Sequence, residues 1–87
     1  MAFDGSMQIT LRYHALLREK TGRSDERLEL PAGASAAEAL ARFFAKYPAL
    51  AALEKSLQVA VNDEFAARGQ ALHEGDCLDL LPPFGGG

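Results

Sequence analysis

The sequence predicts a single α+β domain in which one main helix packs on one face of a mixed sheet of four to five strands. Three observations support this prediction. Residues 7–13 alternate apolar and polar side chains as a half-buried strand does, residues 35–47 repeat apolar side chains at helical spacing, and residues 57–61 and 77–81 alternate again. Segregated helical and strand segments are typical of an α+β arrangement. At 87 residues the chain has the length of one domain.

The first third of the domain is predicted to form a strand, a short helix and a second strand. Residues 1–6 precede the first alternating segment and are interpreted as a disordered N-terminal tail. Residues 14–21 have helical spacing, and Gly22 suits the left-handed position that follows a helix end. Residues 23–26 predict a polar turn, and residues 27–30 predict a second strand that can pair antiparallel with the first.

The main helix has a start signal, an apolar stripe and a stop signal. Ser35 and Glu38 form a capping box, in which the serine side chain accepts a hydrogen bond from a first-turn amide. The stripe consists of Leu40, Phe43, Phe44 and Tyr47. Pro48 ends the helix. Leu50 and Leu53, in the alanine-rich stretch that follows, predict a short helical turn that closes the core.

The C-terminal half is predicted to add three more strand segments. Residues 57–61 form a strand, and Asn62-Asp63 tolerates the positive φ angles of a tight hairpin turn. Residues 64–67 form a short paired strand after that turn. Residues 73–76 make another turn, and residues 77–81 form the last strand. The folded domain is therefore predicted to span residues 7–81.

Charge, hydropathy and cysteine content limit the possible partners. The net charge of −3 argues against a nucleic-acid binder. No apolar run approaches the ~20 residues that a membrane span requires, so no membrane partner is expected. The single cysteine, Cys77, cannot form an internal disulfide, which fits a reducing compartment. The predicted location is cytoplasmic.

No set of side chains has the pattern of an active site. The acidic pairs fall in predicted turns, where carboxylates are solvated: Asp25-Glu26, Asp63-Glu64 and Glu74/Asp76. His14 and His73 lack a second ligand at metal-binding spacing, so no metal is predicted. Cys77 has no histidine base beside it in the sequence and is interpreted as a small half-buried residue. The chain has no phosphate-binding loop motif, so we do not expect it to bind ATP by that device.

Residues 82–87 are chemically the most distinctive part of the chain. Pro82 and Pro83 end the last strand and stiffen the base of the tail. The glycines that follow have no Cβ, so they can enter a narrow tunnel, and attack at the Gly87 carbonyl is unhindered. A partner could activate this carboxylate with ATP as an acyl adenylate, and a thiol or persulfide could displace AMP. The alternative is a frayed end without chemistry.

Several segments together resemble a known family. The order of elements resembles the ubiquitin-like β-grasp fold, and the chain is similar over residues 7–87 to the small-subunit family of molybdopterin synthase. The segments that carry this resemblance are Tyr13-His14-Ala15-Leu16-Leu17-Arg18-Glu19 followed by Gly22, Val59-Ala60-Val61-Asn62, Leu72-His73-Glu74-Gly75-Asp76, Leu80-Leu81-Pro82-Pro83 and the terminal Gly86-Gly87. The double proline is the most discriminating feature. The chain departs from the pattern at Phe84 and Gly85.

The resemblance implies a sulfur carrier whose chemistry lies at Gly87. An adenylating enzyme of the ubiquitin-activating type would use ATP to form the acyl adenylate, and a persulfide enzyme would supply sulfur to give a thiocarboxylate. The tail residues Gly85, Gly86 and Gly87 would then enter the large subunit of molybdopterin synthase and deliver sulfur to a pterin precursor of the molybdenum cofactor. The chain itself would bind no cofactor and would be the non-catalytic, sulfur-donating subunit of a sulfurtransferase.

The resemblance also implies a docking surface near the base of the tail. The expected partner contacts are Leu81, Pro82, Pro83, Phe84 and His14. Three other interpretations remain open on the residues alone. The chain could carry sulfur for thiazole or cysteine synthesis, it could be a protein modifier conjugated to lysines through Gly87, or it could be a plain interaction module with an inert glycine tail.

Overall fold

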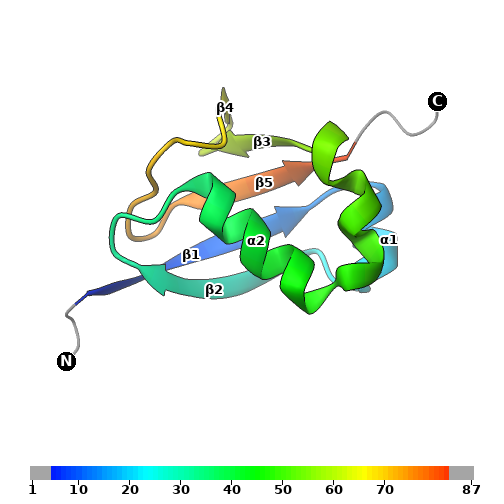
Figure 1. Cartoon of the computed structure of the whole chain (residues 1–87), viewed down its shortest axis with the longest axis horizontal. Helices are drawn as coiled ribbons and strands as arrows, with labels where there is room; N and C mark the ends of the chain where they lie inside the picture. The colour runs from blue at the N-terminus through cyan, green and yellow to red at the C-terminus, as the bar shows by residue number, and fades with distance from the viewer. Residues whose placement is uncertain (1–4, 83–87) are drawn as a thin grey trace.

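The computed structural model describes residues 5–82, which form one five-stranded sheet and the helices that pack on it (Figure 1). The elements along the chain are β1 (Ser6–Tyr13), α1 (Leu16–Thr21), β2 (Asp25–Pro31), α2 (Ala36–Lys46), the 3₁₀ helix η1 (Pro48–Ser56), β3 (Gln58–Val61), β4 (Glu64–Ala66) and β5 (Cys77–Leu81). The strand order is β2-β1-β5-β3-β4. Strands β1 and β5 are parallel and the other neighbours are antiparallel. The predicted α+β fold with a mixed sheet is confirmed.

Strands β1 and β2 form the predicted antiparallel pair, but this pair is longer than expected. β1 begins at Ser6, which pairs with Pro31, and β2 begins at Asp25, which pairs with Arg12. The prediction of a polar turn over residues 23–26 was therefore wrong for residues 25 and 26, which belong to β2. The turn is shorter than predicted because the pairing of β1 extends to its last residue, where the Tyr13 N–H donates to the Ser24 carbonyl at 2.9 Å.

The connection between β1 and β2 contains α1, which starts later than predicted. The helix begins at Leu16, because Ala15 has a φ of +49° and turns the chain out of the strand before the helix can start. His14, predicted as helical, is instead held at the end of β1. Gly22 ends α1 in the left-handed conformation with a φ of +76°, as expected.

Helix α2 follows the predicted signals at both ends. The Ser35 side chain accepts a hydrogen bond from the Glu38 N–H, and the helix ends before Pro48. The amides of Ala36 and Ala37 donate to carbonyls of the loop before β5, so the helix start is also tied to that loop. The helix has 11 residues, and across residues 5–82 none of the helices combines the length and apolarity needed to cross a membrane.

The hairpin between β3 and β4 has the predicted turn. Asn62 and Asp63 both have positive φ angles, +50° and +72°, as a two-residue turn matching the strand twist requires. Val61 pairs with Glu64 across this turn. The tight turn therefore sets which β4 side chains face α2 and which face away, because one residue of slip would exchange the two faces.

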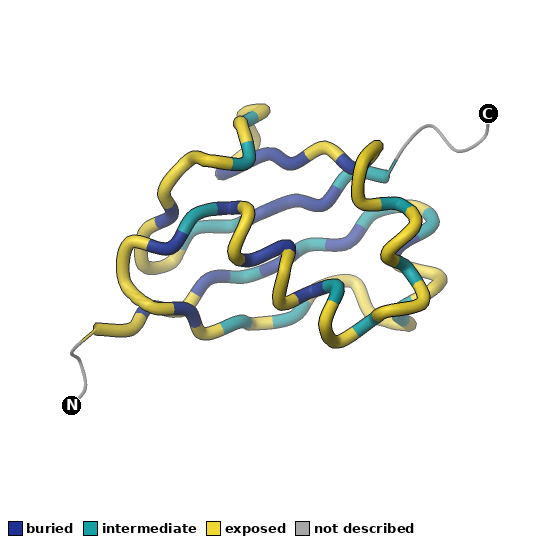
Figure 2. Tube along the Cα trace, in the orientation of Figure 1, coloured by how far each residue is buried: buried dark blue, intermediate teal, exposed yellow. Residues whose placement is uncertain are grey.

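The core lies between the sheet and α2 (Figure 2). The side chains with the least exposure come from each layer, and they include Tyr13, Leu17, Leu40, Phe43, Leu78 and Leu80. On the opposite face of the sheet, here called the outer face, most strand residues are exposed or half-buried. This asymmetry follows from the alternation of side chains along each strand. It leaves the outer face as the broad surface available for contact.

Candidate functional site

The base of the C-terminal tail leaves the sheet from an interior strand. Leu81 ends β5 and pairs with Gln58 of β3, while β1 lies on the other side of β5. Leu81 and Pro82 are both half-buried. Residues 83–87 lie outside the described residues, so the predicted roles of Pro83, Phe84, Gly85, Gly86 and Gly87 stay predictions. The chain therefore leaves the sheet at the end of an interior strand and not from an edge strand.

A row of outer-face residues crosses four strands beside this exit. Phe65 of β4 pairs with Ala60 of β3, Ala60 pairs with Asp79 of β5, and Asp79 pairs with Arg12 of β1. Among residues 5–82, Phe65 is the large apolar side chain that remains exposed, at 76%. Phe65 lies on the edge strand β4, two strands away from β5, whose end leads into the tail. We call the outer-face residues Arg12, His14, Ala60, Phe65, Asp79 and Leu81 the docking face.

The centre of the docking face is a buried carboxylate held by two side chains. Arg12 donates from Nε to Asp79 Oδ1 at 2.6 Å and from Nη2 to Asp79 Oδ2 at 3.0 Å. His14 Nε2 lies 3.0 Å from Asp79 Oδ1. The Asp79 side chain is only 6% exposed although it points away from α2. The bidentate arginine pair is the strong form of this interaction, and it holds Arg12 and His14 in place on the surface.

The pKa values of Asp79 and Arg12 are both shifted in the direction that favours their charged forms. Hydrogen bonding from Arg12 lowers the pKa of Asp79, and the bond from His14 acts in the same direction, whereas burial opposes both. The bond to Asp79 likewise raises the pKa of Arg12. Arg12 Nη2 also donates to Asp63 of the hairpin turn at 3.0 Å. The ion pair between Arg12 and Asp79 therefore persists throughout the physiological pH range.

Of the residues predicted to contact a partner, Leu81, Pro82 and His14 lie in the described part of the chain. The parallel pairing of Tyr13 with Leu80 brings His14 beside the end of β5, where Leu81 is located. The structure thus brings the predicted contacts of the domain together, although His14 is not on the helix where it was expected. Whether they contact a partner stays a prediction.

Three residues of the docking face were missed in the sequence. Asp79 was treated only as a polar position between the core residues Leu78 and Leu80, and Arg12 only as a polar position of the first strand. The position of Asp79 within an apolar strand could have identified it, because a buried carboxylate needs a nearby cation. Phe65 could not be assigned to a face until the hairpin register was known.

Cys77 lies half-buried on the outer face and is unsuited to nucleophilic chemistry. Burial raises the pKa of its thiol, and the nearby carboxylates add to this effect although Arg12 opposes it. The thiol is therefore protonated at neutral pH. Among residues 5–82, no group of three histidine, cysteine or acidic side chains is arranged to hold a metal ion.

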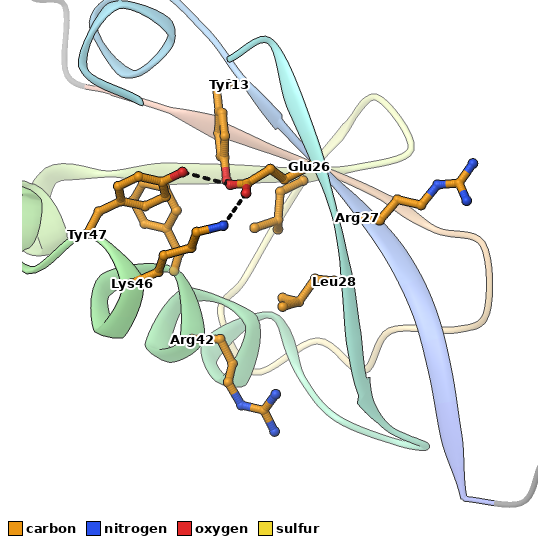
Figure 3. A pocket seen from close by; sticks show the side chains of 9 residues that line it. Tyr13, Glu26, Arg27, Leu28, Arg42, Lys46 and Tyr47 are labelled. Carbon is orange, nitrogen blue, oxygen red and sulfur yellow. Dashed lines mark hydrogen bonds and ion pairs between the residues drawn. The ribbon is translucent and has the colours of Figure 1, made fainter. Parts of the chain in front are cut away.

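A second polar cluster lies on the other face, between β2 and α2 (Figure 3). Glu26 was predicted to be a solvated turn residue, and this was wrong, because β2 turns its side chain toward α2 and leaves it 10% exposed. It accepts hydrogen bonds from the hydroxyls of Tyr13 at 2.5 Å and Tyr47 at 3.0 Å, and it pairs with Lys46 and Arg23. The cavity beside it measures about 50 Å³, far below the roughly 300 Å³ of small ligand sites. The cluster therefore joins β1, β2 and α2 and is not a binding site.

Acid is expected to weaken the fold through both clusters. Burial opposes ionisation of Glu26, but hydrogen bonds from Lys46, Tyr13 and Tyr47 lower its pKa overall, and the pKa of Asp79 is also lowered. Such carboxylates stabilise the fold above their ordinary pKa values, 4.5 and 3.8, and this stability is lost as the pH falls toward the lowered values. Urea unfolding from about pH 7 to about pH 3 should show this decline, which Asp79→Asn should reduce. A free energy of unfolding that is constant over this range would contradict the assignment.

Comparison with known proteins places the chain in a family. The model of the ThiS family matches residues 11–87. The molybdopterin synthase sulfur carrier subunit of Chlamydomonas reinhardtii is 36% identical over 83 residues, which cover 93% of this chain and 100% of that protein. The subunit of the same name from Arabidopsis thaliana is 29% identical over 82 residues, covering 94% and 85%.

Among solved structures, SAMP1 from Haloferax volcanii (small archaeal modifier protein 1) superposes with a TM-score of 0.79 at 30% identity, covering 92% of this chain and 99% of that one. The sheet order, the single main helix and the nearly full-length matches agree with one another. The chain therefore belongs to the ThiS family of ubiquitin-like β-grasp proteins and, within it, to the family of molybdopterin synthase sulfur carrier subunits.

Proposed function

We propose that this chain carries sulfur as a thiocarboxylate on Gly87 and delivers it to a pterin precursor in molybdopterin synthase. The observation that carries the proposal is the position of Leu81 and Pro82, where an interior strand ends beside an open docking face and a glycine-terminated segment follows. The names of the two curated relatives support the pathway. The raised pKa of the thiol of Cys77, the single cysteine of the chain, supports placing the sulfur on Gly87 and not on this side chain.

The proposed chemistry proceeds in balanced steps. The Gly87 carboxylate attacks the α-phosphorus of ATP in an adenylating partner, pyrophosphate leaves, and an acyl adenylate forms. The terminal sulfur of a persulfide attacks the acyl carbon and AMP leaves. A second thiol then attacks the resulting acyl disulfide, which releases the thiocarboxylate and leaves a disulfide on the donor. In the large subunit the thiocarboxylate sulfur attacks a carbon of the pterin precursor and displaces an oxygen leaving group from it. Water then cleaves the resulting thioester, which leaves the sulfur on the pterin and restores the Gly87 carboxylate.

The docking face would position the tail during the last of these steps. Phe65 supplies an exposed aromatic anchor, and Leu81 and Pro82 supply the half-buried base from which the tail extends. Aromatic side chains are enriched among residues that dominate binding energy. We expect Phe65→Ala to weaken binding to the large subunit by about 2 kcal/mol, near thirtyfold in Kd. Glu29→Ala, an exposed residue on the same face at the opposite edge strand β2, is the matched control, and equal Kd values for the two variants would contradict this role.

Intact-protein mass spectrometry tests the sulfur-carrier proposal directly. The chain is incubated with the adenylating enzyme, ATP and a persulfide donor from the same organism. The expected product is heavier by the mass difference between one sulfur and one oxygen atom, and fragmentation should place the change on Gly87. A spectrum that shows only the unmodified chain, with a relative of known activity converted in a parallel reaction, would overturn the proposal.

A second candidate function is protein modification through the same carboxylate. The similarity to SAMP1 at 30% identity favours keeping this candidate, because that protein is named as a modifier. Here Gly87 would form an isopeptide bond with lysines of target proteins. The distinguishing result is a ladder of conjugates on a denaturing gel that disappears when Gly87 is removed. A free thiocarboxylate without such a ladder favours the sulfur carrier.

A further inference from the structure

We propose that the Arg12–Asp79–His14 cluster determines partner specificity, by requiring the large subunit to place a neutral hydrogen-bond acceptor opposite Arg12. This inference rests on the proposed function, because it assumes that the docking face contacts that subunit. The starting observation is the location of the cluster. A buried carboxylate with a bidentate arginine lies on the outer face, in the same row as the exposed Phe65.

One nitrogen of Arg12, Nη1, has hydrogen-bonding capacity that the cluster does not use. Arg12 uses Nε and Nη2 toward Asp79, and Nη2 also reaches Asp63. Among residues 5–82, no acceptor is bonded to Arg12 Nη1, and the side chain is 42% exposed. A partner that covers this face removes water from Nη1. An apolar surface there would leave its N–H groups without acceptors, which carries a large penalty for a charged donor.

The charges around Arg12 select the kind of acceptor. One guanidinium already faces two carboxylates, Asp79 and Asp63. A third carboxylate from the partner would be repelled by this local excess of negative charge, and a partner ammonium or guanidinium group would offer Nη1 no acceptor. A backbone carbonyl, an amide oxygen or a hydroxyl satisfies Nη1 without either cost. The cluster therefore admits partners with a neutral acceptor at this point and rejects those with an apolar or acidic surface.

Two double variants separate recognition from stability. The double variant Arg12→Leu with Asp79→Leu removes both members of the ion pair. Folded domains commonly tolerate such a replacement because no unpaired charge remains. Arg12→Asp with Asp79→Arg exchanges the partners and keeps an ion pair at the same place. Arg27→Leu is the matched control, since Arg27 is an exposed arginine on the same face at β2, the edge strand far from Phe65. Calorimetry with the large subunit from the same organism measures Kd, and thermal unfolding measures stability.

We expect both double variants to remain folded and to bind the large subunit about tenfold to a hundredfold more weakly, while Arg27→Leu binds as the unmodified chain does. Full binding by the exchanged pair would show that the pair only supports the fold, and it would overturn the proposal. Binding by the leucine pair within about twofold of the unmodified chain would overturn it as well. If the exchanged pair does not fold, the leucine pair decides. Failure of the unmodified chain to bind the large subunit would contradict the proposed function and this inference together.

Discussion

Removing Gly87 is expected to reduce sulfur transfer to background while leaving the domain as stable as before. The core of residues 5–82 already joins the sheet to α2, so we expect the deletion to leave this packing unchanged. Deletion moves the carboxylate back by one residue, about 3.5 Å along an extended chain. Reacting atoms must approach within about 3 to 3.5 Å, so a shift of this size removes the productive geometry. A reconstituted synthase assay measures transfer, and thermal unfolding measures stability.

The control for this deletion is Ala45→Ser, an exposed position on α2 outside the docking face, which leaves the tail unchanged. Because its carboxylate can still reach the same position, we expect the transfer to remain. Transfer at the unmodified rate after deletion of Gly87 would place the sulfur elsewhere on the chain. Loss of thermal stability on deletion would show that the tail packs on the domain. Mass spectrometry of the shortened chain would then be needed to decide whether the lost transfer reflects lost sulfur loading.

Replacing Glu26 by alanine is expected to lower the free energy of unfolding by about 2 to 4 kcal/mol. The carboxylate is 10% exposed and accepts from the hydroxyls of Tyr13 and Tyr47. Tyr13 is 2% exposed, so its hydroxyl would lose its partner inside the protein. The same carboxylate holds Lys46 at the end of α2, so the variant loosens the contact between that helix and β2. Urea unfolding at neutral pH measures the effect.

Glu29→Ala provides the comparison, because Glu29 lies on the same strand with its side chain exposed on the outer face. A change below about 0.5 kcal/mol is expected there, as for most surface substitutions. Equal losses for the two variants would mean that the hydroxyl contacts of Glu26 contribute nothing beyond strand propensity. The Glu26 variant should retain sulfur loading at temperatures where it is folded, because Glu26 pairs with the core residue Leu11 and so lies on the face opposite the docking face.

The predictions for Gly87 and Glu26 concern separate parts of this molecule. Helix α2 and the inner face of the sheet supply the packing that stabilises the fold, and in the proposed function the docking face supplies recognition. The proposed reaction takes place at a carboxylate outside both.

The sequence by itself determined the features that depend on neighbouring residues. Ser35 caps α2, Gly22 ends α1 with a positive φ, and Asn62-Asp63 makes the hairpin turn, because each depends on the conformational preferences of a few adjacent residues. The alternation of side chains was sufficient for β1, β3 and β5. The double proline and the terminal glycines were sufficient to propose where the chemistry lies, since that proposal depends on covalent structure alone.

Only the tertiary structure decided which polar residues act together. Arg12 and Asp79 are separated by 67 positions and meet because β1 and β5 are parallel neighbours. No local pattern encodes that register, which results from burying both strands under α2. Glu26 was misjudged for the same reason, because its environment comes from Tyr47 and Lys46 on another element. Charges are placed by long-range pairing, whereas turns and caps are placed by the chain beside them, and this difference separates what could be predicted here from what could not.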